Sequence, residues 1–346
     1  MTAPIDIARR FYRSAFTLEP LGNGHINDTY LVATHAEPFV LQKINSRVFP
    51  QPALIMANLG KLNRHVEEAN AGDHQLKLPK LIPAETGDAF IRDAQGECWR
   101  ALSYIPNTES LEVLTNLSHA QQVGNALGQF HRLTRTLDAE ALDDTLPGFH
   151  IAPDYLKHYQ DVKSRTAKAI DDECEEVINR FQDIVHDLES AKEQGLLAVR
   201  TTHGDPKLNN FLFDKDSGKI ISLIDLDTVK PGLIHYDIGD CIRSSCHNPN
   251  TGEFDLQTCG VILSAYLQEM GRYLTASDYD YLYSAIRLIP FELGLRFYTD
   301  YLDGNRYFKV TEPDENLHRA LEQFRLFSSI VSLEDEIKII INRQKM

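Results

Sequence analysis

The stretch HGDPKLNN, residues 203–210, decides the fold of this chain. His203, Asp205 and Asn210 have the spacing of a phosphoryl-transfer loop, in which the aspartate accepts the proton of an acceptor hydroxyl and the asparagine binds Mg²⁺. Lys207 lies two residues beyond Asp205 and could reach the γ-phosphate of a nucleotide. The stretch therefore predicts Asp205, Lys207 and Asn210 as catalytic residues.

A second carboxylate follows this loop at the end of an apolar run. The apolar segment 211–213, the polar, glycine-bearing segment 214–219 and the apolar segment 220–224 predict a β-hairpin. Its two ends would carry Asn210 and Asp225. Mg²⁺ in proteins typically takes one or two carboxylates together with water and phosphate oxygens. We therefore expect Asn210 and Asp225 to be the metal ligands.

The residue after the loop histidine is Gly204, where protein kinases have arginine. With this loop the chain resembles the aminoglycoside phosphotransferase and choline kinase superfamily. Within that superfamily it looks most like the bacterial N-acetylhexosamine 1-kinases. The segments that carry this resemblance span nearly the whole chain: LGNGHINDTYLV (21–32), FVLQKIN (39–45), HGDPKLNNFLFD (203–214), IDLDTVKPG (224–232), YDIGDCIRSSC (236–246) and FELGLRFYTDYLDGNRYFK (291–309). The resemblance implies ATP and Mg²⁺ as cofactors and transfer to the anomeric hydroxyl of GlcNAc or GalNAc.

The expected fold class is α+β, a bilobal protein-kinase-like fold. It has a small N-terminal β-sheet lobe with one helix and a larger, mainly helical C-terminal lobe. We place the nucleotide-binding lobe at residues 1–103, a hinge at 104–110, and the catalytic and acceptor-binding lobe at 111–346. A chain of 346 residues is longer than one average domain, which agrees with two lobes.

The composition is that of a globular enzyme, with 42% hydrophobic residues and no apolar run as long as a membrane span. The N-terminus lacks an apolar signal stretch, so a cytoplasmic protein is expected. The five cysteines form no Cys-x-x-Cys pair, which argues against a disulfide framework and a structural zinc site. The net charge of −15 disfavours binding to nucleic acid or to anionic membranes. The expected partner is a small-molecule sugar or related hydroxyl acceptor, and monomer and dimer both stay open.

A glycine-bearing loop separates the predicted strands 18–21 and 29–32. Backbone groups of Gly22, Asn23 and Gly24 could cover nucleotide phosphates, although a plain hairpin turn would have the same pattern. The resemblance implies that His25 and Asp28, in the same loop, face the sugar. At the other end of the small lobe, we expect Tyr104 and Ile105 to hold the adenine through the backbone of the hinge.

The third predicted strand, 39–44, should carry the cation that pairs with the α- and β-phosphates. Because strand side chains alternate between faces, Gln42 and Lys43 cannot both point inward without a bulge. Alignment favours Gln42 and charge favours Lys43, so both are candidates. The helix expected at 51–69 should carry a glutamate partner for such a lysine, but its middle contains none.

The larger lobe reads as helical. Ser118 and Gln121 form a capping-box pattern ahead of one helix, and a long apolar stripe predicts helix over 154–194. Pro290 predicts a break or kink in the helical segment after Ser277.

Several residues in this lobe are candidates for binding the acceptor, because sugars are held by directional hydrogen bonds and aromatic faces. Each of them could instead be structural. The candidates beside Asp205 are Arg243, Glu292, Arg296, Tyr298 and Arg306. The superfamily resemblance also implies an aspartate near residue 237 that braces the catalytic loop. Asp227 is either a second carboxylate of the metal region or a salt-bridge partner, and we favour a position behind the metal ligands.

Other functions are compatible with parts of the sequence. The first alternative is a kinase of another hydroxyl acceptor, such as choline, an aminoglycoside, homoserine or another sugar. The second is a metallophosphoesterase with two metals, and the third is a catalytically silent nucleotide-binding module. The residues that could form a two-metal cluster are His203, Asp205, Asp225, His235 and Asp237.

Overall fold

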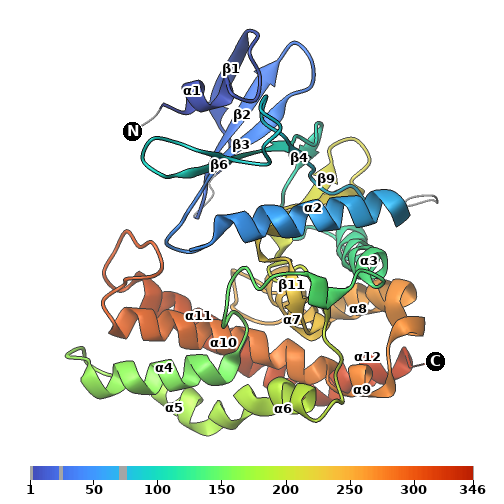
Figure 1. Ribbon diagram of the computed structural model, residues 1–346. Helices are drawn as coiled ribbons and strands as arrows, with labels where there is room; N and C mark the ends of the chain where they lie inside the picture. Colours follow the sequence, from blue (N-terminus) through green and yellow to red (C-terminus); the bar gives the residue numbers. More distant parts are fainter. Residues whose placement is uncertain (1–2, 23–25, 70–75, 346) are drawn as a thin grey trace.

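Short β-rich segments in the first hundred residues pair into an antiparallel sheet. A computed structural model describes residues 3–22, 26–69 and 76–345 and orders the strands β1-β2-β3-β6-β4, with β5 also paired to β6 (Figure 1). The elements of this lobe are α1 (Pro4–Ala8), β1 (Phe16–Pro20), β2 (Asp28–Thr34), β3 (Phe39–Ile44), α2 (Pro52–Ala69), β4 (Leu81–Ile82), β5 (Ile91–Arg92) and β6 (Cys98–Ser103).

The two faces of this sheet belong to different cores. Leu41 and Trp99 pack with α1 in the smaller core of the lobe, whereas Ile44 and Cys98 belong to the core that α2 shares with the larger lobe. Side chains alternate along a strand. Gln42 therefore lies on the face of Ile44, towards the larger lobe.

The chain crosses between the lobes after β6. β7 (Thr108–Glu109) lies within the segment predicted as the hinge, and it pairs with β9 (Phe211–Asp214) of the larger lobe. β10 (Ile220–Leu223) completes that sheet, and β8 (Arg200–Thr202) pairs separately with β11 (Lys230–Gly232). The hairpin predicted after the catalytic loop is present as β9 and β10.

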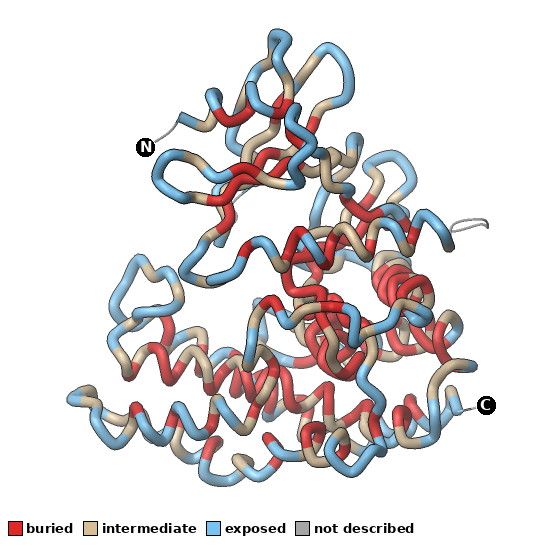
Figure 2. Tube along the Cα trace, in the orientation of Figure 1, coloured by how far each residue is buried: buried red, intermediate tan, exposed pale blue. Residues whose placement is uncertain are grey.

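The larger lobe is built mainly from helices, and the buried residues run along their facing sides (Figure 2). α10 packs against α4, α7 and α11, and α3 packs against α8. A Cβ at Gly124 of α3 would lie 2.3 Å from the Ile262 carbonyl oxygen, so glycine permits this close packing. The helices are α3 (Leu117–Thr134), α4 (Ala152–Arg165), α5 (Asp172–Phe181), α6 (Asp187–Glu193), α7 (Ile234–Ser245), α8 (Leu256–Met270), α9 (Ala276–Asp280), α10 (Leu282–Leu302), α11 (Glu315–Ser332) and α12 (Glu334–Arg343).

The predicted α+β fold with two lobes is confirmed, but three local predictions are wrong. Asn116, and not Ser118, caps α3, because its side chain accepts from the His119 amide. The stripe over 154–194 is divided among α4, α5 and α6, and Asp171 caps α5. α10 continues through Pro290, since its flanks are buried on several sides and packing holds the helix despite the missing amide.

All five cysteines are buried and free. Within the described ranges, the search for a helix long and apolar enough to cross a bilayer found none.

Candidate active site

The catalytic loop follows β8, and Asp237 of α7 fixes its backbone. The amides of His203 and Gly204 donate to the Asp237 carboxylate at 2.7 and 2.8 Å, and His131 lies 2.9 Å from it. Burial alone would raise the pKa of Asp237, but the hydrogen bond and charge of His131 outweigh this and lower it. Asp237 thus has the bracing position that the resemblance implied.

Gly204 is required by the shape of this loop. Its φ is +88°, in the left-handed region, and a Cβ there would lie 2.6 Å from the Thr228 carbonyl oxygen. The Thr228 hydroxyl donates to the His203 carbonyl at 2.8 Å, which keeps the two segments in contact. The arginine that protein kinases have here would not fit.

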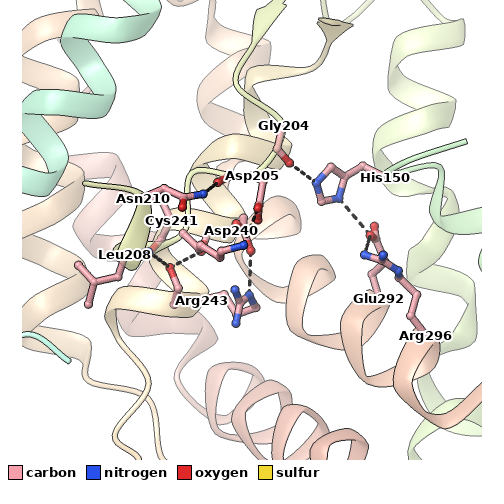
Figure 3. Close-up of polar contacts among 12 residues, drawn as sticks. His150, Gly204, Asp205, Leu208, Asn210, Asp240, Cys241, Arg243, Glu292 and Arg296 are labelled. Carbon is pink, nitrogen blue, oxygen red and sulfur yellow. Dashed lines mark hydrogen bonds and ion pairs between the residues drawn. The ribbon is translucent and has the colours of Figure 1, made fainter. Parts of the chain in front are cut away.

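The three predicted catalytic residues lie together. Lys207 Nζ donates to Asp205 Oδ2 at 2.6 Å, and the Asn210 amide nitrogen donates to the Asp205 carbonyl at 2.7 Å (Figure 3). Burial alone would lower the pKa of Lys207, but the charges of Asp205 and Asp225 raise it, so the ammonium is the favoured form.

Asp225 stands at the end of β10 in a left-handed conformation, with φ +62°. The Ile224 amide donates to the Asn210 carbonyl at 2.9 Å, which ties the two ends of the hairpin together. Asp225 is exposed on one side, yet the surrounding protein removes enough water, and Asp227 adds enough negative charge, to raise its pKa to about 6. An amide oxygen and a crowded carboxylate suit the hard, oxygen-seeking Mg²⁺, so these residues fit the expected metal.

The phosphate side of the small lobe differs from the expected arrangement. Lys43 lies opposite Asp28 in the β2–β3 pair and its Nζ is 2.8 Å from the Asp28 carboxylate, on the sheet face turned away from Ile44. The prediction that Lys43 supplies the phosphate-binding cation is therefore not supported. The carboxylate of Asp28, which was expected to face the sugar, forms an ion pair with Lys43. Gln42 faces the larger lobe and accepts hydrogen bonds from Arg100.

The glycine-bearing loop is described only at its edges. Gly22 has φ +68°, as a tight loop after β1 requires. Asn23, Gly24 and His25 lie outside the described residues, so their predicted contacts stay predictions. Tyr104 and Ile105 are half-buried in the crossing between β6 and β7, where the adenine was expected.

The middle of α2 carries Asn58 where a glutamate was expected. Asn58 is buried, and its amide nitrogen donates to the carbonyls of Asp143 and Val229 at 2.8 and 2.9 Å. It anchors α2 to the segment just beyond Asp225 through the backbone. Only its position in the middle of the helix could have pointed to it.

An open pocket of about 490 Å³, a volume suited to a small molecule, is lined by residues of α4, α10 and the segments 146–149 and 303–308, and by none of the catalytic loop. The nearest link to that loop is His150, which follows the lining segment 146–149 and lies 2.9 Å from the Gly204 carbonyl.

Arg296 lies at the wall of this pocket, with its guanidinium 5.0–5.7 Å from the ring centres of Phe149, Tyr155 and Phe308. Burial alone would lower the pKa of Arg296, but Tyr155, Glu292 and, more weakly, Asp205 raise it. Arg296 is therefore a charged donor within the electrostatic reach of the catalytic aspartate.

The Asp300 side chain folds one wall of this pocket. Its carboxylate accepts the amides of Arg306, Tyr307 and Phe308 at 2.8–3.0 Å and the Asn316 side chain at 2.9 Å. Sequence reasoning missed Asp300, because its partners follow an irregular loop with no periodic signal.

The other predicted acceptor residues differ in access. Arg306 also lines the pocket and is exposed, with Asp303 3.4 Å away. Arg243 donates to Asp240 at 2.9 Å beside the catalytic loop. Tyr298 is wrong as an acceptor residue: it is fully buried, and its hydroxyl accepts from the Asp171 amide.

Glu292 is also buried, which corrects its predicted contact with the acceptor. Its carboxylate meets His150 Nδ1 at 3.0 Å, and His150 Nε2 donates to the Gly204 carbonyl at 2.9 Å (Figure 3). Glu292 as a carboxylate and the Gly204 carbonyl are both acceptors, so the imidazolium form of His150, which donates from both nitrogens, satisfies both of them. Sequence reasoning assigned no role to His150.

The two-metal alternative does not form in the described part of the chain. His235 Nε2 contacts the Asp278 carbonyl at 2.9 Å, and Asp237 is occupied by the loop amides. No group of three His, Cys, Asp or Glu side chains within residues 3–22, 26–69 and 76–345 is arranged to hold a metal.

Comparison with known proteins agrees with this geometry. A family model described as the phosphotransferase enzyme family matches residues 17–271. A microcompartment-associated aminopropanol kinase has the same fold, with 19% identity, a TM-score of 0.69 and coverage of 96% of this chain and 98% of that one. An aminoglycoside phosphotransferase from Alicyclobacillus acidocaldarius has 14% sequence identity and a TM-score of 0.65, with coverage of 98% of this chain and 97% of that one. An amicoumacin kinase, solved in complex with AMP-PNP and Ca²⁺, has 14% sequence identity and a TM-score of 0.64, with coverage of 96% of this chain and 92% of that one.

Proposed function

Because the chain belongs to the phosphotransferase enzyme family and acts on a hydroxyl group, we propose that it is an ATP- and Mg²⁺-dependent kinase that phosphorylates the anomeric hydroxyl of an N-acetylhexosamine. The observation that carries the acceptor class is the pocket wall, where a charged guanidinium lies among three aromatic rings. Aromatic faces suit a sugar ring, and Arg296 can donate to ring hydroxyls or to an acetamido carbonyl.

The charges of the pocket disfavour a polycationic acceptor. Of the three aspartates that line it, Asp300 is saturated by four donors and Asp303 is paired with Arg165 and Arg306. Arg296 Nη1 lies 3.9 Å from the Glu292 carboxylate, and Asp154 is the one lining carboxylate left without a hydrogen-bond or ion-pair partner among the described residues. The pocket therefore offers no cluster of unpaired carboxylates to a polycationic aminoglycoside.

The residues of the loop then have distinct tasks. Asp205 accepts the proton of the acceptor hydroxyl as the oxygen attacks the γ-phosphorus. Lys207 occupies Asp205 Oδ2, so Oδ1 is the atom we assign to this proton, and the ammonium stabilises charge on the phosphoryl oxygens. Asn210 and Asp225 would hold Mg²⁺, which neutralises negative charge on the nucleotide phosphates when bound.

The test is ADP release from the wild-type chain with ATP, Mg²⁺ and a panel of acceptors. We expect turnover with GlcNAc or GalNAc and none with the methyl glycosides of the same sugars, in which the anomeric hydroxyl is blocked. Phosphorus NMR of the product should show coupling to the anomeric proton. Turnover of 1-aminopropan-2-ol, choline or kanamycin, without turnover of either sugar, would replace the sugar assignment with the cationic alternative.

A further inference from the structure

Arg100 lies directly opposite Gln42 in the antiparallel pair of β3 and β6. Directly opposed residues of two paired strands share one face of the sheet. Gln42 is on the face turned to the larger lobe, so the Arg100 side chain is directed there as well. The position where a phosphate-binding lysine was expected is therefore held by the neutral Gln42. The positively charged Arg100 lies next to it on the neighbouring strand β6.

Two side chains of the small lobe, Arg100 and Asn27, contact one carboxylate of the larger lobe, and Gln42 holds the first of them. Arg100 Nη2 is 2.5 Å from Asp227 Oδ1, and both side chains are almost completely buried, with 1% and 2% exposed. Gln42 Oε1 accepts from Arg100 Nε and Nη2 at 3.0 and 2.7 Å, and Asn27 donates to Asp227 Oδ2 at 2.9 Å. Asp227 follows Asp225 by two residues, so this network reaches the expected metal site.

The network leaves a buried donor without a partner. Among the described residues, Arg100 Nη1 has no hydrogen-bond partner, and the contact at Asp227 Oδ1 is an ion pair without an aligned hydrogen bond. A guanidinium has five N–H donors, and proteins rarely leave such donors unsatisfied in their interior.

The usual small-lobe pair of a strand lysine and a helix glutamate does not supply this cation. Lys43 is on the opposite face and paired with Asp28. Asn58, in the middle of α2, bonds to backbone carbonyls and offers no carboxylate to a lysine. In this chain the cation and its carboxylate therefore come from different lobes.

We propose that Arg100 is the small-lobe residue that binds the nucleotide, with Nη1 donating to an oxygen of the α- or β-phosphate. Asp227 and Gln42 are positioning residues that hold the guanidinium. The inference rests on the proposed use of ATP. The ion pair between Arg100 and Asp227 joins the two lobes. The contact that brings the lobes together therefore also places the phosphate-binding cation.

The experiment is titration calorimetry of the full chain with AMP-PNP and Mg²⁺. Arg100→Met should weaken nucleotide binding about 10- to 100-fold, as expected for lost hydrogen bonds to a charged group, and leave the acceptor KM within about threefold. Arg100→Lys should recover part of the affinity, because it keeps the charge without the planar fork. Arg92→Met, which removes an exposed cation of the neighbouring strand β5, is the matched control and should bind as the wild type.

Arg100→Met leaves Asp227 buried without its cation and could fail to fold. The double variant Arg100→Met/Asp227→Asn removes both charges and should show the same loss of nucleotide affinity. Wild-type affinity in Arg100→Met or in the double variant would overturn the inference and leave the proposed function intact. A large loss in Lys43→Met with none in Arg100→Met would also overturn it. If the wild type bound no nucleotide, the proposed function would fail as well.

Discussion

The catalytic loop and the acceptor pocket lie next to each other, joined through His150, and they are held in different ways. The backbone of the loop is fixed by buried groups, with Asp237 accepting two of its amides and Thr228 donating to one of its carbonyls. The pocket wall consists of the segments 146–149 and 303–308 and one side of α4 around Arg296, and it is open to solvent. If the proposed function is right, catalytic positioning and acceptor recognition rest on separate scaffolds.

This difference suggests how substitutions should divide between the kinetic constants. Groups that act only on the reacting atoms change kcat, whereas groups that hold the acceptor equally before and during reaction change KM. Changes in the loop should lower kcat, and changes in the pocket should raise the acceptor KM. Three substitutions test this division, and a fourth tests the side chain that joins the two regions.

Asp205→Asn should have the largest effect. It keeps the size of the side chain but removes the base, so kcat should fall about 10²- to 10⁴-fold. Nucleotide affinity should change little, since Asp205 has no assigned phosphate contact. Steady-state ADP release and calorimetry with AMP-PNP measure the two effects. Asp161→Asn, on the exposed face of α4, is the control. Retention of wild-type kcat would remove Asp205 from the mechanism.

Arg296→Met should have the second-largest effect, and this effect should be on the acceptor KM. Loss of the guanidinium from the aromatic wall should raise the acceptor KM about 10- to 100-fold, with nucleotide affinity unchanged. Arg296→Lys should recover little of the lost affinity, because lysine lacks the planar group that stacks on rings. An equal loss of nucleotide affinity would mean that loop and pocket are not separate.

His150→Asn tests the side chain that joins the two regions. Asparagine tolerates the φ of +65° at this position but cannot span from Glu292 to the Gly204 carbonyl. At pH 6 the variant should lose ~1–3 kcal/mol of unfolding free energy, because buried partners remain unsatisfied.

The pH dependence of this loss has a definite sign. Burial alone would lower the pKa of His150, but the Glu292 carboxylate raises it above its usual 6.5. The contribution of the imidazolium is therefore complete below about pH 6.5 and is lost as pH rises through the folded-state pKa. Urea unfolding of wild type and variant from pH 6 to 9 should show a shrinking difference. A difference that grows with pH would contradict the charged ring. His318→Asn, on the surface of α11, controls for a general histidine effect.

The sequence revealed the catalytic loop in detail and the pocket only in part. The loop residues predicted for catalysis lie within six consecutive positions, and their spacing directly reflects their contacts. His150 and Glu292 are 142 positions apart, and only the packing of α10 brings them together. The same holds for Arg100, whose partner Asp227 lies in the other lobe.

Local rules failed where tertiary packing was strong. Pro290 should interrupt a helix, but α10 is surrounded by α4, α7 and α11 and remains continuous. Alternation along β3 predicted that only one of Gln42 and Lys43 faces inward, but it could not decide which. That choice depends on which face of the sheet meets the larger lobe, and the pairing with β6 decides it.

Arg306→Met should have the smallest effect on the acceptor KM. It tests whether contacts with the acceptor extend to the solvent-exposed part of the pocket wall. The Arg306 side chain is 72% exposed and its ion pair with Asp303, at 3.4 Å, is screened by water. The acceptor KM should therefore rise less than about fivefold. Arg296→Met makes the same chemical change in the same pocket, so the ratio of the two KM values isolates the effect of enclosure by aromatic rings. Equal effects would mean that the segment 303–308 folds over the acceptor and makes Arg306 a full member of the binding site.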